Sequence, residues 1–162
     1  MNFKEVLIPG EFVKRYKRFF VDVKIANKIF TAHCPNTGSM MGLLKEGSRV
    51  WLSKSDNPKR KLKYTLEIIE DRKSKVGVNT HQTNKIVLDG LNTSNIEGFK
   101  DLDMIQKEVK FGKDTRFDFL VTKKEKKSFI EVKNVTLSRK KGIAEFPDAV
   151  TSRGLKHIKE LL

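Results

Sequence analysis

The chain has 162 residues, and its 38% of hydrophobic residues suffice for one folded core or two small ones. No apolar run approaches the roughly 18 residues of a membrane-spanning helix, and no signal peptide is evident, which argues against integral membrane and secreted classes and predicts a cytoplasmic protein with no membrane partner. The single cysteine, Cys34, excludes an internal disulfide framework and fits a reducing compartment.

The charge of the chain is strongly positive: 34 lysines and arginines face 20 acidic residues, a formal net charge of +14. An excess of this size favours polyanions through Coulomb attraction and counterion release, so nucleic acid is the first candidate partner. An anionic membrane surface is the competitor, but the sequence shows no long amphipathic basic helix. A lysine-rich proteome gives the same excess, so composition alone does not decide the partner.

Short segments of alternating polarity fill the N-terminal half. In residues 15–25 every second residue from Phe19 onward is apolar, which predicts a half-buried strand with Phe19 in the core, turning at Asn27 and Lys28. Residues 35–44 are expected to form a short helix or a loop that plugs one end of the resulting small barrel, which resembles an oligonucleotide-binding (OB) fold. The other strands are predicted at 28–34, 50–55, 62–71 and 76–78.

The pattern changes near residue 79. Residues 80–92 carry apolar residues at helical spacing, with Thr80 as the predicted N-cap. Three strands follow, at 105–111, 115–121 and 129–135. A polar linker is predicted at 137–142, and a helix capped by Asp148 at 146–162. We therefore predict an α+β chain, with an OB-like nucleic-acid-binding barrel at 1–78 and a second domain at 79–162.

Three acidic residues form a row across the strands of the second domain. Folding the first connection about Lys113 places Glu108 opposite Asp118, and folding the second about Glu125 places Asp118 within one residue of Glu131. Like charges across a sheet are destabilising unless something offsets them, and oxygen ligands of this kind suit Mg²⁺ or Mn²⁺.

Lys133 points to the same side as Glu131, because side chains two apart in a strand share a face. A metal site beside such a lysine is typical of enzymes that cut phosphodiesters, with Asp118, Glu131 and Lys133 as catalytic residues. The alternative interpretation is an antiparallel meander whose acids are ordinary solvent-facing charges.

Basic and aromatic residues alternate in two stretches of the barrel. Cations that track phosphates beside rings that stack on bases are typical of single-strand binding barrels. The candidate phosphate contacts are Arg15, Arg18, Arg60 and Lys61, and Tyr16 or Phe20 is the candidate stacking platform. In the last helix Arg153 and His157 share a face and are either a further phosphate contact or part of a solvated surface.

Several strings of the sequence carry a resemblance to a known family. They are AHCPNTGSM (32–40), NPKRKLKYT (57–65), VGVNT (76–80), TRFDFLV (115–121), FIEVKNVTL (129–137) and FPDAVTSRGLKHIKEL (146–161). Together they resemble the bacterial and archaeal sugar fermentation stimulation protein family. The resemblance implies an OB-type barrel followed by a domain like the PD-(D/E)XK nucleases, whose signature positions Asp118 and Glu131-Val132-Lys133 occupy.

The resemblance also implies a third acid, for which Asp89, Glu97 and Glu108 are candidates. Family members continue past residues 157–161 into further strands, so the second domain is expected to be incomplete, as a truncated product or as a shortened natural version. The family is described as DNA-binding, with a suggested regulatory part in sugar metabolism. A nuclease fold does not by itself establish cleavage.

Two functions of different kind remain. The first is a DNA-binding protein of little sequence preference, with RNA not excluded as a partner, and the second is a nuclease dependent on Mg²⁺ or Mn²⁺. We expect DNA binding as the function and keep cleavage as the alternative, with the DNA target and the oligomeric state left open.

Overall fold

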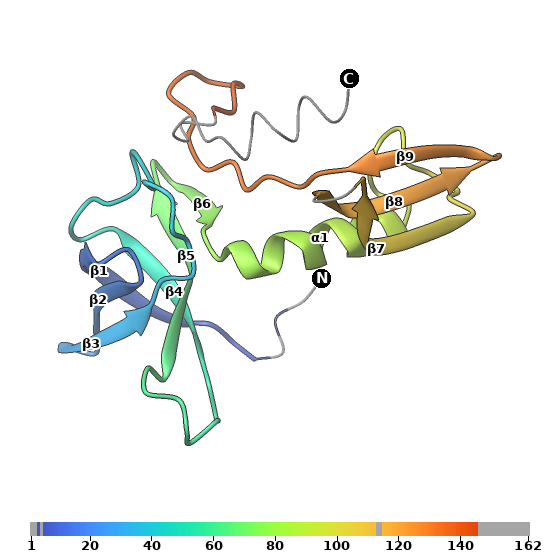
Figure 1. The fold of residues 1–162 in the computed structure, drawn as a ribbon. Helices are drawn as coiled ribbons and strands as arrows, with labels where there is room; N and C mark the ends of the chain where they lie inside the picture. Colours follow the sequence, from blue (N-terminus) through green and yellow to red (C-terminus); the bar gives the residue numbers. More distant parts are fainter. Residues whose placement is uncertain (1–2, 4, 113–114, 146–162) are drawn as a thin grey trace. The chain divides into compact units, whose positions relative to one another are not determined.

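The computed structural model describes residues 3, 5–112 and 115–145, and these divide into two compact units (Figure 1). One unit contains the residues up to His81 together with 134–145, and the other contains Gln82–Lys133. The helix expected at 146–162, with Arg153 and His157, lies outside the described residues. Within the described residues, no helix is both long and apolar enough to cross a membrane.

A closed barrel forms the first unit. Its strands are β1 (Ile8–Tyr16), β2 (Phe20–Ile25), β3 (Lys28–His33), β4 (Arg49–Lys54), β5 (Tyr64–Asp71) and β6 (Ser74–Gly77). The order in the sheet is β3-β2-β1-β4-β5-β6, and a parallel pairing of His33 with Thr65 joins β3 to β5. Five strands therefore close on themselves, with β6 added beside β5, which confirms the OB-like barrel.

The single strand predicted at 15–25 is wrong. The segment contains the end of β1, a tight turn at Lys17 and Arg18, and β2. Both turn residues have positive φ, 48° and 62°, and Phe19 completes a three-residue connection, because Tyr16 pairs with Phe20. Positive φ in turns is usually marked by Gly, Asn or Asp, so two basic residues gave no turn signal. The same pair of positive φ values occurs at Ala26–Asn27, Arg72–Lys73 and Lys124–Glu125.

Apolar side chains fill the barrel, and most of them come from alternating positions of its strands. The buried side chains are Phe12, Val21, Val23, Ala32, Cys34, Met40, Leu43, Val50, Leu52, Leu66, Ile69 and Val78. The segment between β3 and β4 contributes Met40 and Leu43 to this core and forms turns rather than a helix, while Met41 and Leu44 are exposed. Phe19, expected in the core, is 48% exposed because it follows the turn instead of lying within a strand.

The second unit contains a three-stranded meander and a helix. The helix α1 (Thr80–Asn92) precedes β7 (Met104–Phe111), β8 (Thr115–Lys123) and β9 (Lys126–Ile130), and the sheet order is β7-β8-β9 (Figure 1). The N-cap differs from the prediction: Oδ1 of Asn79 accepts the backbone N–H of His81 at 3.0 Å. The hydroxyl of Thr80 instead donates to the carbonyl of Pro35 at 2.8 Å.

The pairing of the meander decides where its acids lie. Phe111 pairs with Thr115 and Lys107 with Phe119, which confirms a fold of the first connection about residue 113. The second hairpin turns at Lys124 and Glu125, so Phe119 pairs with Ile130 and β9 ends earlier than predicted.

Leu91 of α1 packs with Phe119 and Val121 of β8 in a second apolar core. The chain is thus an α+β protein, as predicted.

Candidate functional site

The carboxylate of Asp118 is held by two donors from different elements. Asn84 of α1 donates its side-chain N–H to Oδ1 at 2.7 Å, and the backbone N–H of Val132 donates to Oδ2 at 2.7 Å. Asp118 is half-buried at the middle of β8. Each carboxylate oxygen has two acceptor directions, so one direction on each oxygen is used and the carboxylate is fixed in orientation with capacity remaining.

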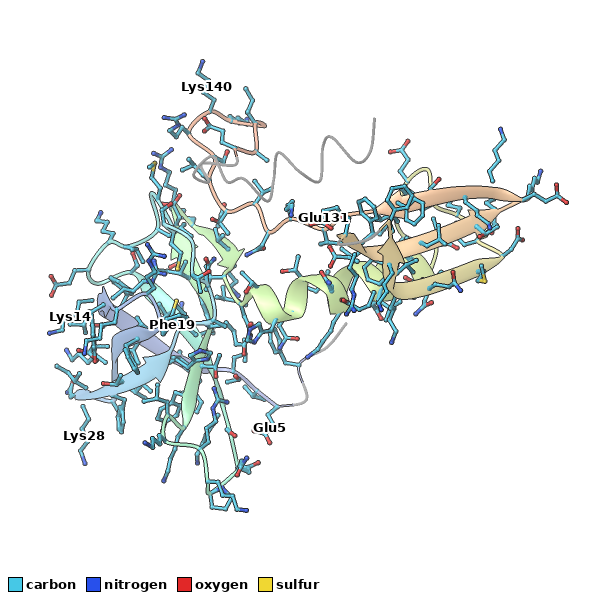
Figure 2. The ribbon with its side chains drawn as sticks, in the orientation of Figure 1. Glu5, Lys14, Phe19, Lys28, Glu131 and Lys140 are labelled. Carbon is cyan, nitrogen blue, oxygen red and sulfur yellow. The ribbon has the colours of Figure 1, made fainter. Side chains whose placement is uncertain are left out.

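Glu131 and Lys133 follow β9 directly and form an ion pair. Nζ of Lys133 lies 2.6 Å from Oε1 of Glu131. The Glu131 side chain is 22% exposed and the Lys133 side chain 55%, so the acid lies deeper than the amine (Figure 2 labels Glu131). The prediction that these two residues share a side agrees with this contact.

Glu108 lies level with Asp118 in the pairing, because the pairs on either side of it join Lys107 to Phe119 and Val109 to Phe117. Its φ is +54°, a left-handed conformation that interrupts the regular pleat of β7. Its carboxylate lies 3.8 Å from the guanidinium of Arg116, and both side chains are more than half exposed.

Each acid of the predicted row therefore has a donor or a cation of its own. In the part of the chain that the structure describes, no three His, Cys, Asp or Glu side chains lie in a group that could hold a metal ion. The alternative third acids, Asp89 and Glu97, are exposed.

Sequence reasoning missed Asn84. The amide carries no charge, so a search for acids and cations passes over it. One signal was available: Asn84, Val87, Leu88 and Leu91 recur at helical spacing, and the last three pack against the sheet. A polar residue on the apolar face of a helix needs a partner on the element that the helix covers.

Arg15, predicted to contact phosphate, is engaged within the barrel. Its guanidinium donates to the backbone carbonyls of Asn36 at 2.7 Å and Gly38 at 2.9 Å, and to that of Arg18 at 2.9 Å. These bonds tie the end of β1 to the turn before β2 and to the loop after β3. The structure thus gives Arg15 a bracing role.

The other predicted cations lie in the connections between strands. Arg18 is exposed in the β1–β2 turn, and Lys61 is exposed in the β4–β5 connection. Arg60, in the same connection, is half-buried and donates to the hydroxyl of Thr65 at 2.6 Å. The predicted cations therefore come from two connections, β1–β2 and β4–β5. The sequence did not indicate that Arg60 donates a hydrogen bond within the barrel.

The side chain of Tyr16, a predicted stacking platform, already has contacts within the barrel. It stacks on Phe20 with ring centroids 5.5 Å apart, and its hydroxyl donates to Asp22 at 3.2 Å. Nζ of Lys14 lies 5.8 Å from the ring centroid. Phe19, next to the β1–β2 turn, is the more open aromatic side chain of this region (Figure 2 labels Lys14 and Phe19).

Comparison with known proteins covers both units. Residues 13–78 match the family described as "SfsA N-terminal OB domain", and residues 81–162 match the family described as "Sugar fermentation stimulation protein RE domain". A relative from Pelagibacter ubique, named "Sugar fermentation stimulation protein homolog", is 60% identical over 100% of this chain and 70% of its own length. A protein of the same name from Maricaulis maris is 47% identical over 99% of this chain and 69% of its own length.

A solved structure has the same fold. It is described as "The structure of Pyrococcus Furiosus SfsA in complex with Ca2+", is 27% identical, and aligns with a TM-score of 0.83 over 99% of this chain and 68% of that one. The matches to both family domains, the two homologues and this structure agree with a barrel followed by a second unit of a sheet and a helix. The chain belongs to the sugar fermentation stimulation protein family.

Proposed function

We propose that the protein binds DNA with little sequence preference, through the connections of its barrel. OB folds bind oligonucleotides with the face of strands β2 and β3 and with the loops between strands one and two and between strands four and five. In this chain both of these loops are basic: the first contains Lys17 and Arg18, and the second contains Lys59, Arg60, Lys61 and Lys63. This placement of cations is the observation that carries the proposal.

The net charge of +14 supports the same function, because counterion release from DNA favours a cationic partner. The exposed ring of Phe19 beside the first loop supplies a surface on which a base can stack. Arg18 and Lys61 are exposed and are the phosphate contacts that we propose, whereas Arg60 is half-buried and donates to Thr65. The buried free thiol of Cys34 accords with a reducing compartment, and we place the protein in the cytoplasm.

Affinity for labelled single-stranded and duplex DNA, measured over a range of salt concentrations, tests the proposal. Each phosphate contact contributes about 0.9 to the slope of log affinity against log salt for duplex DNA. Replacing Arg18 and Lys61 together by alanine is expected to lower that slope by about 2. The matched control is Lys45→Ala, an exposed lysine outside both loops. An affinity that does not change with salt would contradict the proposal.

A second candidate function is metal-dependent cleavage of the bound DNA, carried by the position of Asp118 next to the chain that bears Glu131 and Lys133. The residues fit a hard divalent cation: Asp118 keeps free acceptor directions, and Mg²⁺ commonly takes one or two carboxylates and completes its shell with water and phosphate. Asp118 and Glu131 would hold the ion, and Glu108 as a further ligand stays a prediction.

In this second function the cation, when bound, supplies a Lewis acid to the scissile phosphate. Asn84 and the Val132 N–H hold the Asp118 carboxylate, and Lys133 places a positive charge where negative charge develops. Incubation of DNA with Mn²⁺ and either the unmodified protein or Asp118→Ala separates the two functions. Cleavage that requires both Mn²⁺ and Asp118 supports the second, and retention of DNA without cleavage in either protein supports the first alone.

A further inference from the structure

Two histidines and an arginine meet in the barrel unit, outside the acidic site. His33 ends β3, and His81 lies in the first turn of α1. Their ring centroids are 6.4 Å apart, with the ring planes tilted by 44°. Nearby, Arg60 donates to the hydroxyl of Thr65, which is the residue that pairs with His33 where the barrel closes. Three side chains that can carry positive charge thus lie near the point where β3 pairs with β5 and closes the barrel.

The fold fixes the backbone of this cluster from both sides. Thr80, adjacent to His81, donates its hydroxyl to the carbonyl of Pro35, two residues after His33. Asn79 caps the helix by accepting the N–H of His81. The two histidines therefore cannot move apart without loss of these bonds, although they lie 48 positions apart in the sequence.

We propose that His33, His81 and Arg60 form a phosphate-binding subsite that takes a backbone phosphate of the nucleic acid. The inference rests on the proposed DNA binding and adds a specific position to it. Arg60 belongs to the basic β4–β5 connection, so a nucleic-acid strand bound along this connection would lie next to the two imidazoles. An imidazolium offers N–H donors to phosphate oxygens, and charge-assisted bonds of this kind are about twice as strong as neutral ones.

The free protein holds His33 in its neutral form more readily than an exposed histidine. Burial lowers the pKa of His33, and the positive charges of Arg60 and His81 lower it further. Its cross-strand neighbours, Phe20 on β2 and Thr65 on β5, do not titrate near neutral pH and do not offset this. A phosphate bound among the three groups would add negative charge, which raises the pKa of His33 and favours its protonated form. Phosphate binding is therefore coupled to proton uptake, and the affinity increases as the pH falls.

Nuclear magnetic resonance of the histidine C2–H signals tests the subsite directly. The chain has 3 histidines, so His33→Gln and His81→Gln each remove one signal and assign it. With a short DNA strand added, we expect the pKa of His33 to rise and the signals of both residues to shift. We also expect DNA affinity to increase by about threefold to tenfold between pH 8 and pH 6, up to roughly 1.4 kcal/mol. His33→Gln should flatten this rise, and Lys45→Gln should leave it unchanged.

Inorganic phosphate serves as the second ligand and separates this inference from DNA binding itself. If DNA binds in a salt-dependent way but the pH profile survives both histidine substitutions, the subsite is wrong and the proposed function stands. If phosphate shifts both signals while DNA does not bind, the proposed function fails and the subsite serves small phosphates, which overturns its assignment to nucleic acid. His81 is exposed, so His81→Gln tests the idea without risk to the fold.

Discussion

Asn84 and Asp118 lie 34 residues apart in the sequence, and the structure joins Nδ2 of the first to Oδ1 of the second at 2.7 Å. The bond connects the helix α1 to the central strand β8 of the meander. It orients the acid of the candidate site that lies on the central strand of the meander, and it comes from a residue without charge.

Asn84→Ala removes one of the two donors that orient Asp118. Partners behind a metal-binding carboxylate typically contribute about tenfold to a hundredfold in metal affinity. We therefore expect Asn84→Ala to weaken binding of Mn²⁺ by about tenfold, measured by calorimetry without DNA. Asn92→Ala, an exposed asparagine at the end of the same helix, is the matched control. Equal Mn²⁺ affinity in all three proteins would remove Asn84 from the site.

Lys133→Met tests whether the amine acts on the reaction or on the metal. Because Nζ of Lys133 lies 2.6 Å from Oε1 of Glu131, the substitution removes one positive charge that competes with a metal ion for this carboxylate, and Mn²⁺ affinity should stay equal or increase. Under the second candidate function, cleavage should fall by about a hundredfold to a thousandfold, as when other preorganised donors to a transition state are removed. A parallel loss of Mn²⁺ binding would show that Lys133 acts on the fold of the site instead.

Arg15→Lys separates bracing from phosphate contact, because it keeps the charge and loses the planar fork. The guanidinium reaches the carbonyls of Asn36 and Gly38 as well as that of Arg18, a set that a single ammonium cannot satisfy with the same geometry. We expect a loss of about 2 kcal/mol in the free energy of unfolding, at nearly unchanged DNA affinity.

The chain contains 1 tryptophan, Trp51 on β4, so its fluorescence during urea unfolding reports on the barrel that Arg15 braces. Arg18→Lys, an exposed change in the neighbouring turn, should alter the unfolding midpoint little. Weaker DNA binding by Arg15→Lys with an unaltered midpoint would restore the phosphate-contact interpretation.

Glu67 is a buried acid, 4% exposed, that joins β4 and β5 to the start of the helix. It accepts the hydroxyl of Ser53 at 2.7 Å and the amide N–H of Asn79 at 2.8 Å. Glu67→Leu keeps a similar volume but leaves the Asn79 amide without an acceptor, which should cost about 1–3 kcal/mol in the free energy of unfolding.

Glu67→Gln should cost less than Glu67→Leu, because the Ser53 hydroxyl can rotate to accept from the new amide while the glutamine oxygen accepts from Asn79. Urea unfolding followed by Trp51 fluorescence ranks the two variants. The reverse order, with glutamine worse than leucine, would show that the charge of Glu67 and not its hydrogen bonding is what the barrel uses.

The lowered pKa of His33 gives the barrel a pH dependence of known sign. Above pH 6.5 the residue is mostly neutral in both the folded and the unfolded chain, and below it the unfolded chain binds the proton first. The contribution of His33 is therefore fully present above about pH 6.5 and is lost as the pH falls further. We expect the urea midpoint to drop more between pH 7.5 and 5.5 in the unmodified protein than in His33→Gln, and a larger drop in the variant would contradict the assignment.

Much of the fold follows from local pattern. Strand alternation and the closing distance of a short connection placed Glu108 level with Asp118, and the structure keeps that pairing although Glu108 turns to Arg116. The barrel, the meander and the helix over 80–92 could be predicted for the same reason. The backbone itself imposes the period with which side chains return to one face, which is two residues in a strand and 3.6 residues in a helix. Turns were less readable, because Lys17 and Arg18 adopt positive φ without the residues that usually mark it.

The sequence by itself determined the family, most of the strands from Lys28 onward and the identity of the acids Asp118 and Glu131. Only the tertiary structure decided that Asn84 orients Asp118, that Arg15 braces loops, and that His33 meets His81. Each of these depends on which faces of distant elements pack together. Local periodicity sets the face on which a side chain lies, but the partner across that face is selected by the packing of the whole unit.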